Sequence, residues 1–324
     1  MKLFNSFLAC ELEEYVSYRQ GLGYRDCNLR TLLRPFDSYI SEKNTACLSD
    51  FAPLYFLDFR EQLKGQGSTV NGILTGVRGF FQYLVRKGLF EENPLQDIPA
   101  RAENAFIPFI FSPESVNQLL KSVQNNIRKT DDYFFRDFTV YLAITLLSRC
   151  GLRISEPLKL KLQHYRINEK TIYIEKTKFN KDRLIPLPLM VASEVDNYLA
   201  VRKNFVNNQN KFILAGANEG PLAIRYIYPA FHQAVKKIGL AAVRRIIANT
   251  TFSAPTPHSL RHSFATNTLK DIKSRGECPQ KALPILSAYM GHRKYRYTAL
   301  YLKMLDAEQR QSLVNFSIAR QEDI

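Results

Sequence analysis

Over the first hundred residues, apolar side chains recur every three or four positions, which is the spacing of a helix that buries one face. The pattern appears in four segments, residues 3–18, 28–40, 49–67 and 68–88. The last of them, STVNGILTGVRGFFQYLVRKG, has the most continuous apolar face, and Gly88 ends it. The pattern therefore predicts four helices in an N-terminal domain.

A stretch with three prolines and no apolar periodicity follows, residues 93–109. Helical spacing resumes at Ser112-Pro113-Glu114, which combines a capping residue, a first-turn proline and an acid near the positive end of the helix dipole. We therefore predict domains over residues 1–98 and 111–324, with a linker over residues 99–110.

Between residues 171 and 187 the pattern changes to strict alternation. TIYIEKT and RLIPLP stand on either side of the stretch FNKD, which predicts one β-hairpin. Helical spacing returns after the hairpin. The fold class expected from these patterns is mainly α, with a single small antiparallel sheet in the second domain.

The net charge of the chain indicates which class of molecule it binds. The 324 residues hold 45 Lys and Arg against 30 Asp and Glu, a net charge of +15, which favours a polyanion such as nucleic acid. No apolar run approaches the roughly 20 residues of a membrane span, so we expect no membrane partner.

The number and spacing of the cysteines indicate the cellular compartment of the protein. Five cysteines without a CxxC pair indicate free thiols in a reducing environment. The start MKLFNSFLAC resembles a lipoprotein signal ending at Cys10, but its apolar part is short and interrupted by Asn5 and Ser6. We therefore expect a cytoplasmic protein.

The segment PTPHSLRHSFAT, residues 255–266, concentrates candidate chemistry. His258 and His262 share one face of the expected helix, as in zinc sites, but Arg261 between them and the lack of an evident third ligand disfavour a metal. A helix start and a guanidinium fork suit a phosphate group better. A solvated basic helix end is the alternative.

Two further segments extend this pattern. RCGLRISEPLKL places Arg153 just after a glycine turn, and YMGHRKYRYTALYLKM holds His292 and, nine positions later, Tyr301. With HSLRH they resemble, in order, the signature of the tyrosine recombinases, or phage-type integrases. TVNGILTGVRGFFQYLVRKGLFEENPL is similar to the end of that family's core-binding domain, so the resemblance covers nearly the whole chain.

The resemblance implies a role for each matching residue. Tyr301 would attack a DNA phosphodiester, while Arg153 and Arg261 would hold the non-bridging oxygens. His258 and His292 would donate hydrogen bonds to the same oxygens, and His258 could assist proton transfer from the phenol. Tyr297, one helical turn before Tyr301, is the alternative nucleophile.

A lysine in the hairpin supplies the leaving-group proton in this family. KTKFNKDR offers Lys176, Lys178 and Lys181, and Lys178 matches the family's place, although Thr177 and Phe179 stand where glycines are usual. Glu156 and His262 would support the site. The candidates for DNA contact are Lys181, Arg183, Arg78 and Lys87.

The implied domains are a SAM-like four-helix core-binding domain and a catalytic domain. The implied reaction proceeds through a 3′-phosphotyrosine and a Holliday junction and needs no metal, nucleotide or other cofactor. The implied partners are double-stranded DNA with an inverted-repeat core site and a tetramer of this chain, alone or with related recombinases. The alternatives are a type IB topoisomerase and a catalytically inactive DNA-binding regulator on the same fold.

Two features depart from compact members of the family, and a third extends beyond the signature. Pro157 follows Glu156 where an aliphatic residue is usual, and residues 271–284 are predicted to form an inserted loop. After Tyr301 an amphipathic helix is expected, either packed on its own domain or docked on a neighbouring protomer.

Overall fold

The computed structural model of the chain describes residues 4–24, 26–175, 182–207, 209–292, 295 and 297–302. The predicted lysines Lys176, Lys178 and Lys181, and the predicted tail helix beyond Leu302, lie outside the described residues. The chain divides into two compact units between Ala105 and Phe106. The domain and linker limits proposed above stay predictions.

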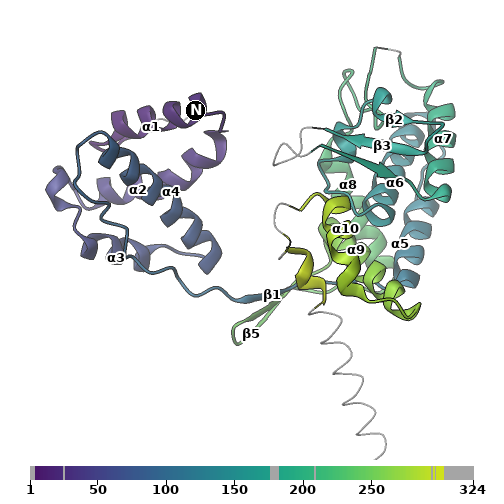
Figure 1. The fold of residues 1–324 in the computed structure, drawn as a ribbon. Coiled ribbons are helices and arrows are strands. Elements are labelled where there is room, and N and C mark those ends of the chain that lie inside the picture. The colour runs from purple at the N-terminus through teal and green to yellow at the C-terminus, as the bar shows by residue number, and fades with distance from the viewer. Residues whose placement is uncertain are drawn as a thin grey trace, which may run out of the picture. The chain divides into compact units, whose positions relative to one another are not determined.

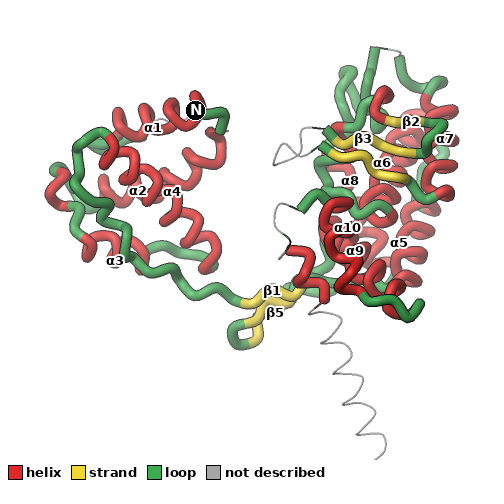
Figure 2. Tube along the Cα trace, in the orientation of Figure 1, coloured by secondary structure: helices red, strands yellow, loops and turns green. Residues whose placement is uncertain are grey.

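The N-terminal unit is helical, as its apolar pattern predicts (Figures 1 and 2). In its described part, α2 packs against both α1 and α4. The helices are α1 (Ala9–Gly21), α2 (Asp26–Glu42), the short 3₁₀ helix η1 (Leu48–Asp50), α3 (Pro53–Gln62) and α4 (Gly67–Arg86).

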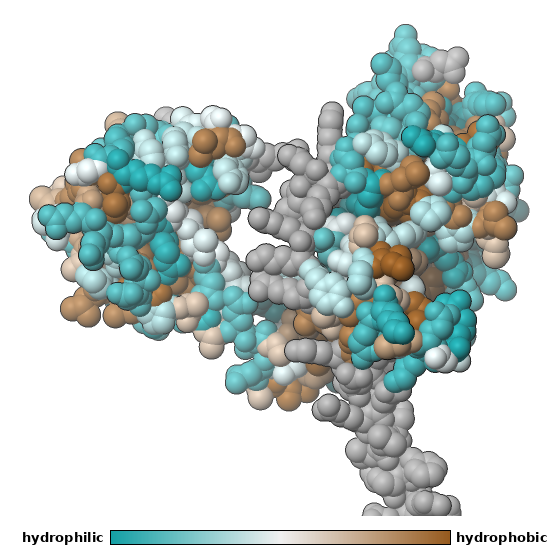
Figure 3. Space-filling model, viewed as in Figure 1, coloured by the Kyte–Doolittle hydropathy of each residue, from teal (hydrophilic) through white to brown (hydrophobic). Residues whose placement is uncertain are grey.

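Aromatic side chains fill the interior of this unit. The ring of Phe36 is fully buried, and its centroid lies 5.4–5.9 Å from those of Phe51, Phe56, Phe59 and Phe81. The face visible in Figure 3 is mostly hydrophilic, with hydrophobic residues scattered over it. The apolar stripes read from the sequence are therefore the buried faces of these helices.

The second unit is built around one central helix, α6 (Asp131–Arg149). Residues 139–148 are buried without a break, because α6 packs against helices on several sides and has no solvent face there. The helices in contact with it are α5 (Pro113–Asn125), α7 (Leu189–Arg202), α8 (Ile227–Lys237) and α9 (Pro257–Ser274). The helix α10 (Pro279–Met290) lies beside α9 (Figure 1). Short 3₁₀ helices are η2 (Pro157–Lys159), η3 (Leu162–His164) and η4 (Ile224–Tyr226).

The predicted hairpin is present. β3 (Thr171–Ile174) pairs antiparallel with β4 (Arg183–Pro186), with Ile172 opposite Ile185, and β2 (Tyr165–Arg166) adds the third strand. The expectation of a single sheet is wrong. A second sheet has the order β1 (Ala105–Ile107), β6 (Thr250–Phe252), β5 (Arg245–Ile247), and its strands are too short to show an alternating pattern in sequence.

The predicted inserted loop over residues 271–284 is also wrong. Helix α9 continues to Ser274, and α10 begins at Pro279, so only a tight turn separates them. Gly276 adopts a φ of +80° just beyond α9, and Pro279 occupies the first turn of α10. Glycine just past a helix end and proline at a helix start are ordinary boundary residues. Within the described ranges, no helix combines the length and apolar composition of a membrane span.

Candidate active site

A glycine turn after α6 places the first arginine. Gly151 has a φ of +58°, and a Cβ atom there would lie 2.4 Å from the ring of Phe264. Both the backbone conformation and the close packing therefore require glycine. Arg153 follows two residues later, which brings its side chain and the Gly151 carbonyl to the same end of α6.

Glu156 is the carboxylate around which two arginines meet. Its side chain is only 6% exposed. Arg153 donates to it from Nη1 at 2.8 Å and from the backbone nitrogen at 2.8 Å, and Arg183 donates from Nη1 at 3.1 Å and Nη2 at 2.9 Å. Burial acts to raise the pKa of Glu156, but the hydrogen bonds and charge of Arg183 outweigh it, so the net pKa is lowered. The carboxylate is therefore ionised at neutral pH.

Arg261 is almost completely buried in α9, at 2% exposure. It donates from Nη1 to the Gly151 carbonyl at 2.7 Å and from Nη2 to the Met290 carbonyl at 2.6 Å. Burial lowers its pKa to about 9, which still leaves the guanidinium charged at neutral pH. The site thus contains the guanidinium groups of Arg153, Arg183 and Arg261 and the carboxylate of Glu156. These four side chains carry a net charge of +2. Such a site attracts an anion.

Tyr301 lies at this positive site. It belongs to a helical turn over residues 297–302 and is 4% exposed. Its hydroxyl is 3.0 Å from Nδ1 of His262, and its ring lies 6.3 Å from that of His292, nearly parallel at 23°. Burial raises the pKa of Tyr301, against the opposing charges of Arg261 and Arg153. The phenol is therefore protonated at neutral pH and needs a base before it can act as a nucleophile.

The three histidines of the site come from two places in the chain, α9 and the segment after α10. His258, in the first turn of α9, is exposed, and its ring meets that of His262 edge-on with centroids 4.7 Å apart. His292, directly after α10, pairs through Nδ1 with the Thr298 hydroxyl at 2.8 Å. Burial and neighbouring positive groups lower the pKa of both His262 and His292 to about 3. In the part of the chain that the structure describes, no cluster of three or more His, Cys, Asp or Glu side chains is arranged to hold a metal.

The structure thus brings together the predicted catalytic and supporting residues that it describes: Arg153, Glu156, His258, Arg261, His262, His292 and Tyr301. Arg183 joins them, although the sequence suggested a DNA contact for it. It is 9% exposed and bound to Glu156, 27 positions away, so no local sequence signal marks the link.

The two DNA-contact candidates of α4 also make protein contacts. Arg78 donates to the carbonyls of Leu95 and Ile98, each at 3.0 Å. Lys87 forms an ion pair with Glu14 at 2.6 Å. Arg78 therefore holds the segment after α4 in place, while Lys87 lies at the surface of the unit.

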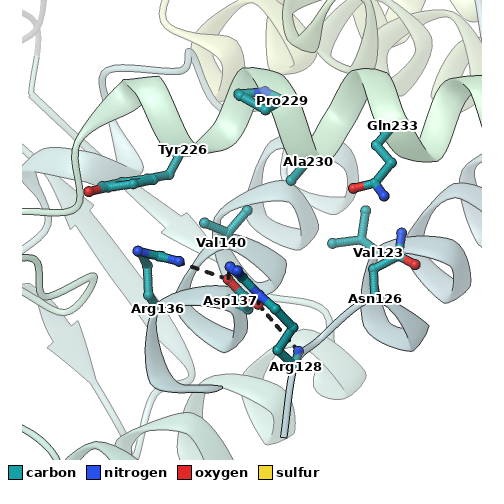
Figure 4. A pocket seen from close by; sticks show the side chains of 10 residues that line it. All are labelled: Val123, Asn126, Arg128, Arg136, Asp137, Val140, Tyr226, Pro229, Ala230 and Gln233. Atoms are coloured by element: carbon teal, nitrogen blue, oxygen red, sulfur yellow. Dashed lines mark hydrogen bonds and ion pairs between the residues drawn. The ribbon is translucent and has the colours of Figure 1, made fainter. Parts of the chain in front are cut away.

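A cavity of about 440 Å³ lies elsewhere, between α5, α6 and α8 (Figure 4). Arg128 and Asp137 form an ion pair in it at 2.7 Å, and Tyr226 and Gln233 line its opposite wall. None of the predicted site residues lines this cavity. The candidate active site is thus defined by its converging side chains and is separate from this cavity.

His262 and His292 should remain neutral at pH 5 in the DNA-free protein. Burial and the nearby guanidinium groups disfavour imidazolium, and the pKa of each lies far below the ordinary value of about 6.5. Imidazole ¹⁵N shifts recorded between pH 4 and 8 check this, with the exposed His232 as a reference ring in the same spectra. A protonation midpoint near 6.5 for either ring would contradict the buried, positively charged surroundings.

Comparison with known proteins identifies the family of this chain. The model of the phage integrase family matches residues 110–308. A putative integrase/recombinase, y4rB, of Sinorhizobium fredii is 27% identical over 294 residues, covering 90% of this chain and 91% of that protein. The tyrosine recombinase XerC of Alcanivorax borkumensis is 28% identical over 235 residues, covering 72% of this chain and 68% of that protein.

Solved structures agree in fold. XerH recombinase bound to a palindromic difH substrate, in a post-cleavage complex, superposes with a TM-score of 0.66 at 18% identity, covering 88% of this chain and 78% of that one. A lambda integrase tetramer bound to a Holliday junction gives a TM-score of 0.60 at 15% identity, covering 89% and 77%. The family model spans more than half of the residues, and the chain therefore belongs to the phage integrase family, the tyrosine recombinases that its motifs resemble.

Proposed function

We propose that this protein is a site-specific DNA recombinase that cuts and rejoins duplex DNA through Tyr301. One observation carries the proposal: the buried phenol of Tyr301 lies 3.0 Å from Nδ1 of His262 and beside the buried Arg261 and the partly exposed Arg153. A nucleophile, a base and an anion-binding group are the parts that attack on a phosphodiester requires.

In the first step, His262 accepts the phenolic proton as Tyr301 attacks phosphorus. We assign this role to His262 rather than to His258, because Nδ1 of His262 is the nitrogen 3.0 Å from the hydroxyl. Burial and the neighbouring positive groups, Arg261 among them, lower the pKa of His262 in the free protein, and the negative phosphodiester offsets the charge part of that effect. The exposed His258 then stabilises the position of the His262 ring through their edge-on contact.

Arg153 and Arg261 bind the non-bridging oxygens and stabilise the charge that builds on them in the transition state. The Tyr301–phosphorus bond forms while the phosphorus–O5′ bond breaks, which leaves a 3′-phosphotyrosine and a free 5′-hydroxyl. The departing oxygen needs a proton, which we assign to Lys178 by its place in the family signature. Rejoining reverses these steps with a new 5′-hydroxyl, so the energy of the broken bond is kept in the ester.

The substrate we propose is double-stranded DNA with an inverted-repeat core site, bound by a tetramer of this chain that passes through a Holliday junction. The net charge of +15 supports the DNA partner. The similarity to XerH on a palindromic site and to a lambda integrase tetramer on a Holliday junction supports the symmetry and the number of copies.

Two alternatives use the same fold differently. A type IB topoisomerase would relax supercoiled DNA without exchanging partners, and a relaxation assay on DNA without the specific site would identify it. A catalytically inactive DNA-binding regulator would need no buried Tyr301–His262 pair, and the convergence of seven site residues favours an enzyme.

A nicked suicide substrate, taken from DNA that flanks the gene, tests the proposal. The wild type should form a protein–DNA adduct that survives denaturant and also forms in EDTA. Tyr301→Phe should form none at all, because it removes the attacking oxygen but leaves the ring packing. The matched control is Tyr297→Phe, one helical turn earlier and 44% exposed, which should react normally.

The other outcomes are equally informative. An adduct that persists in Tyr301→Phe and disappears in Tyr297→Phe would move the nucleophile to Tyr297. Tight, salt-sensitive binding without an adduct from the wild type would favour the regulator.

A further inference from the structure

The C-terminal end of α10 is closed by a turn that uses two of its free carbonyls. Gly291 adopts the left-handed conformation, with φ +64° and ψ +45°, and its N–H donates to the Ala288 carbonyl at 3.0 Å. The N–H of His292 donates to the Ser287 carbonyl, also at 3.0 Å. This arrangement is a Schellman turn, and it leaves the next three carbonyls of the chain available.

Each of those three carbonyls accepts a hydrogen bond from a different arginine of the site. The pairs are Tyr289 with Arg183 Nε at 2.7 Å, Met290 with Arg261 Nη2 at 2.6 Å, and Gly291 with Arg153 Nη2 at 2.7 Å. Carbonyls at a helix C-terminus carry the negative end of the helix dipole and favour cations. The end of α10 is therefore a common anchor for three guanidinium groups that come from separate parts of the chain.

Arg183 differs from the other two arginines in what it reaches. Its Nε binds the Tyr289 carbonyl, and its Nη1 and Nη2 bind the two oxygens of Glu156. Glu156 in turn binds Arg153, which binds the Gly291 carbonyl. These contacts form a closed ring that runs from the end of α10 through Arg183, Glu156 and Arg153 and back to α10.

Packing around this ring leaves little room for other arrangements. The Arg183 side chain is 9% exposed, and a Cβ atom on Gly291 would lie 2.9 Å from Arg183 Nη1. Glycine is therefore needed at 291 both for its backbone conformation and for the close approach of the guanidinium. His292 is the next residue after Gly291, so these contacts also fix the position of the His292 backbone.

We propose that Arg183 is a positioning residue, which ties Glu156 to the end of α10 and thereby holds Arg153 in the orientation that binds the scissile phosphate. The inference rests on the proposed function and deepens it. Arg183 acts through Arg153 and Gly291 rather than through DNA. Arg261 keeps its own contacts to Gly151 and Met290 and does not depend on the ring.

The test compares two substrates that differ in charge at one atom. In a methylphosphonate, a methyl group replaces one non-bridging oxygen of the scissile phosphate, which removes the charge that the arginines neutralise. Arg183→Met should cleave the ordinary nicked substrate about 10²-fold more slowly, with DNA affinity within about twofold of the wild type. On the methylphosphonate, the deficit relative to the wild type should shrink to less than tenfold, because alignment of the arginines then matters less.

Two further variants complete the comparison. Arg166→Met is the matched control, because Arg166 lies on β2 of the same sheet, is about half exposed and pairs with Glu169. It should cleave both substrates like the wild type. Arg183→Lys keeps a positive charge beside Glu156 if the methionine variant folds poorly, but a single ammonium cannot also hold the Tyr289 carbonyl. It should show the same dependence on substrate with a smaller loss, about tenfold.

Several results would overturn the proposal. Equal deficits on both substrates would mean general structural damage. If Arg183→Met binds DNA more weakly, and the slope of its affinity against salt concentration falls by the amount expected for one lost phosphate contact, then Arg183 touches DNA directly.

A second measurement separates this proposal from the proposed function. If the wild type forms no adduct on either substrate, the recombinase proposal fails, and the guanidinium NMR resonances of the DNA-free protein decide on positioning. Arg183→Met should broaden the resonances of Arg153 and leave those of Arg261 unchanged. Unchanged Arg153 resonances would overturn the positioning role whatever the activity.

Discussion

Replacing Arg261 by lysine should slow cleavage of the scissile phosphate by about 10³-fold or more, while DNA affinity changes little. Arginines that stabilise the transition-state charge of phosphoryl transfer contribute factors of about 10³–10⁵. The Arg261 guanidinium binds the Gly151 and Met290 carbonyls and still has N–H groups left for a phosphate. A lysine ammonium is a single point and cannot keep all these contacts.

Single-turnover cleavage of the nicked substrate measures the effect. The matched control is Arg275→Lys, at the other end of the same helix, where the side chain is 64% exposed. It should react at the wild-type rate. A loss of less than tenfold in Arg261→Lys, with an unchanged melting temperature, would show that Arg261 does not meet the reacting phosphate.

Replacing Glu156 by glutamine should lower the free energy of unfolding by about 3–5 kcal/mol, because the buried guanidinium of Arg183 then loses its counter-charge. For a unit of this size that loss corresponds to a fall of about 10 °C in melting temperature. Chemical denaturation of the two proteins side by side gives the difference directly.

The pH dependence of that difference is a further check. The pKa of Glu156 lies below its ordinary value of 4.5, so its contribution to stability is complete above pH 4.5 and is lost as the pH falls through the lower, folded-state pKa. The difference between wild type and Glu156→Gln should therefore shrink below pH 4.5.

Glu169→Gln is the matched control for this prediction. It removes a carboxylate from an arginine pair with the same three-residue spacing, Arg166–Glu169, but both side chains are about half exposed. An exposed pair contributes little, so the change should stay below about 0.5 kcal/mol. Equal effects of the two substitutions would contradict the importance of burial at Glu156.

The sequence predicts the architecture well in two situations: where an apolar repeat continues over several helical turns, and where only one residue type fits a position. The stripe of α4 runs for five turns, and its buried face is the one that the pattern indicates. Gly151 likewise marks a turn that no other residue fits, which is why Arg153 could be placed beside the end of α6. The order of the motifs also pointed to His262 and His292, whose rings lie beside Tyr301 in the structure, while the roles of these residues stay predictions.

Other features have no local signal. The strands β5 and β6 are three residues long, which is too short to separate alternation from chance. The turn between α9 and α10 has the composition of a loop but the geometry of two helix ends. The bonds of Arg183 to Glu156 and to Tyr289 join residues 27 and 106 positions away, and only the tertiary fold decides them.

The buried contact between Tyr301 and His262 has a consequence for mixed assemblies. The hydroxyl of Tyr301 lies against His262 of its own domain, and Arg153 and Arg261, which we propose bind the phosphate, belong to the same domain. Under the proposed mechanism, cleavage is thus arranged in cis, and a defective copy cannot borrow the tyrosine of a neighbour. A cell that expresses intact and Tyr301-deficient copies together should therefore show interference in proportion to the defective share, rather than complementation between them.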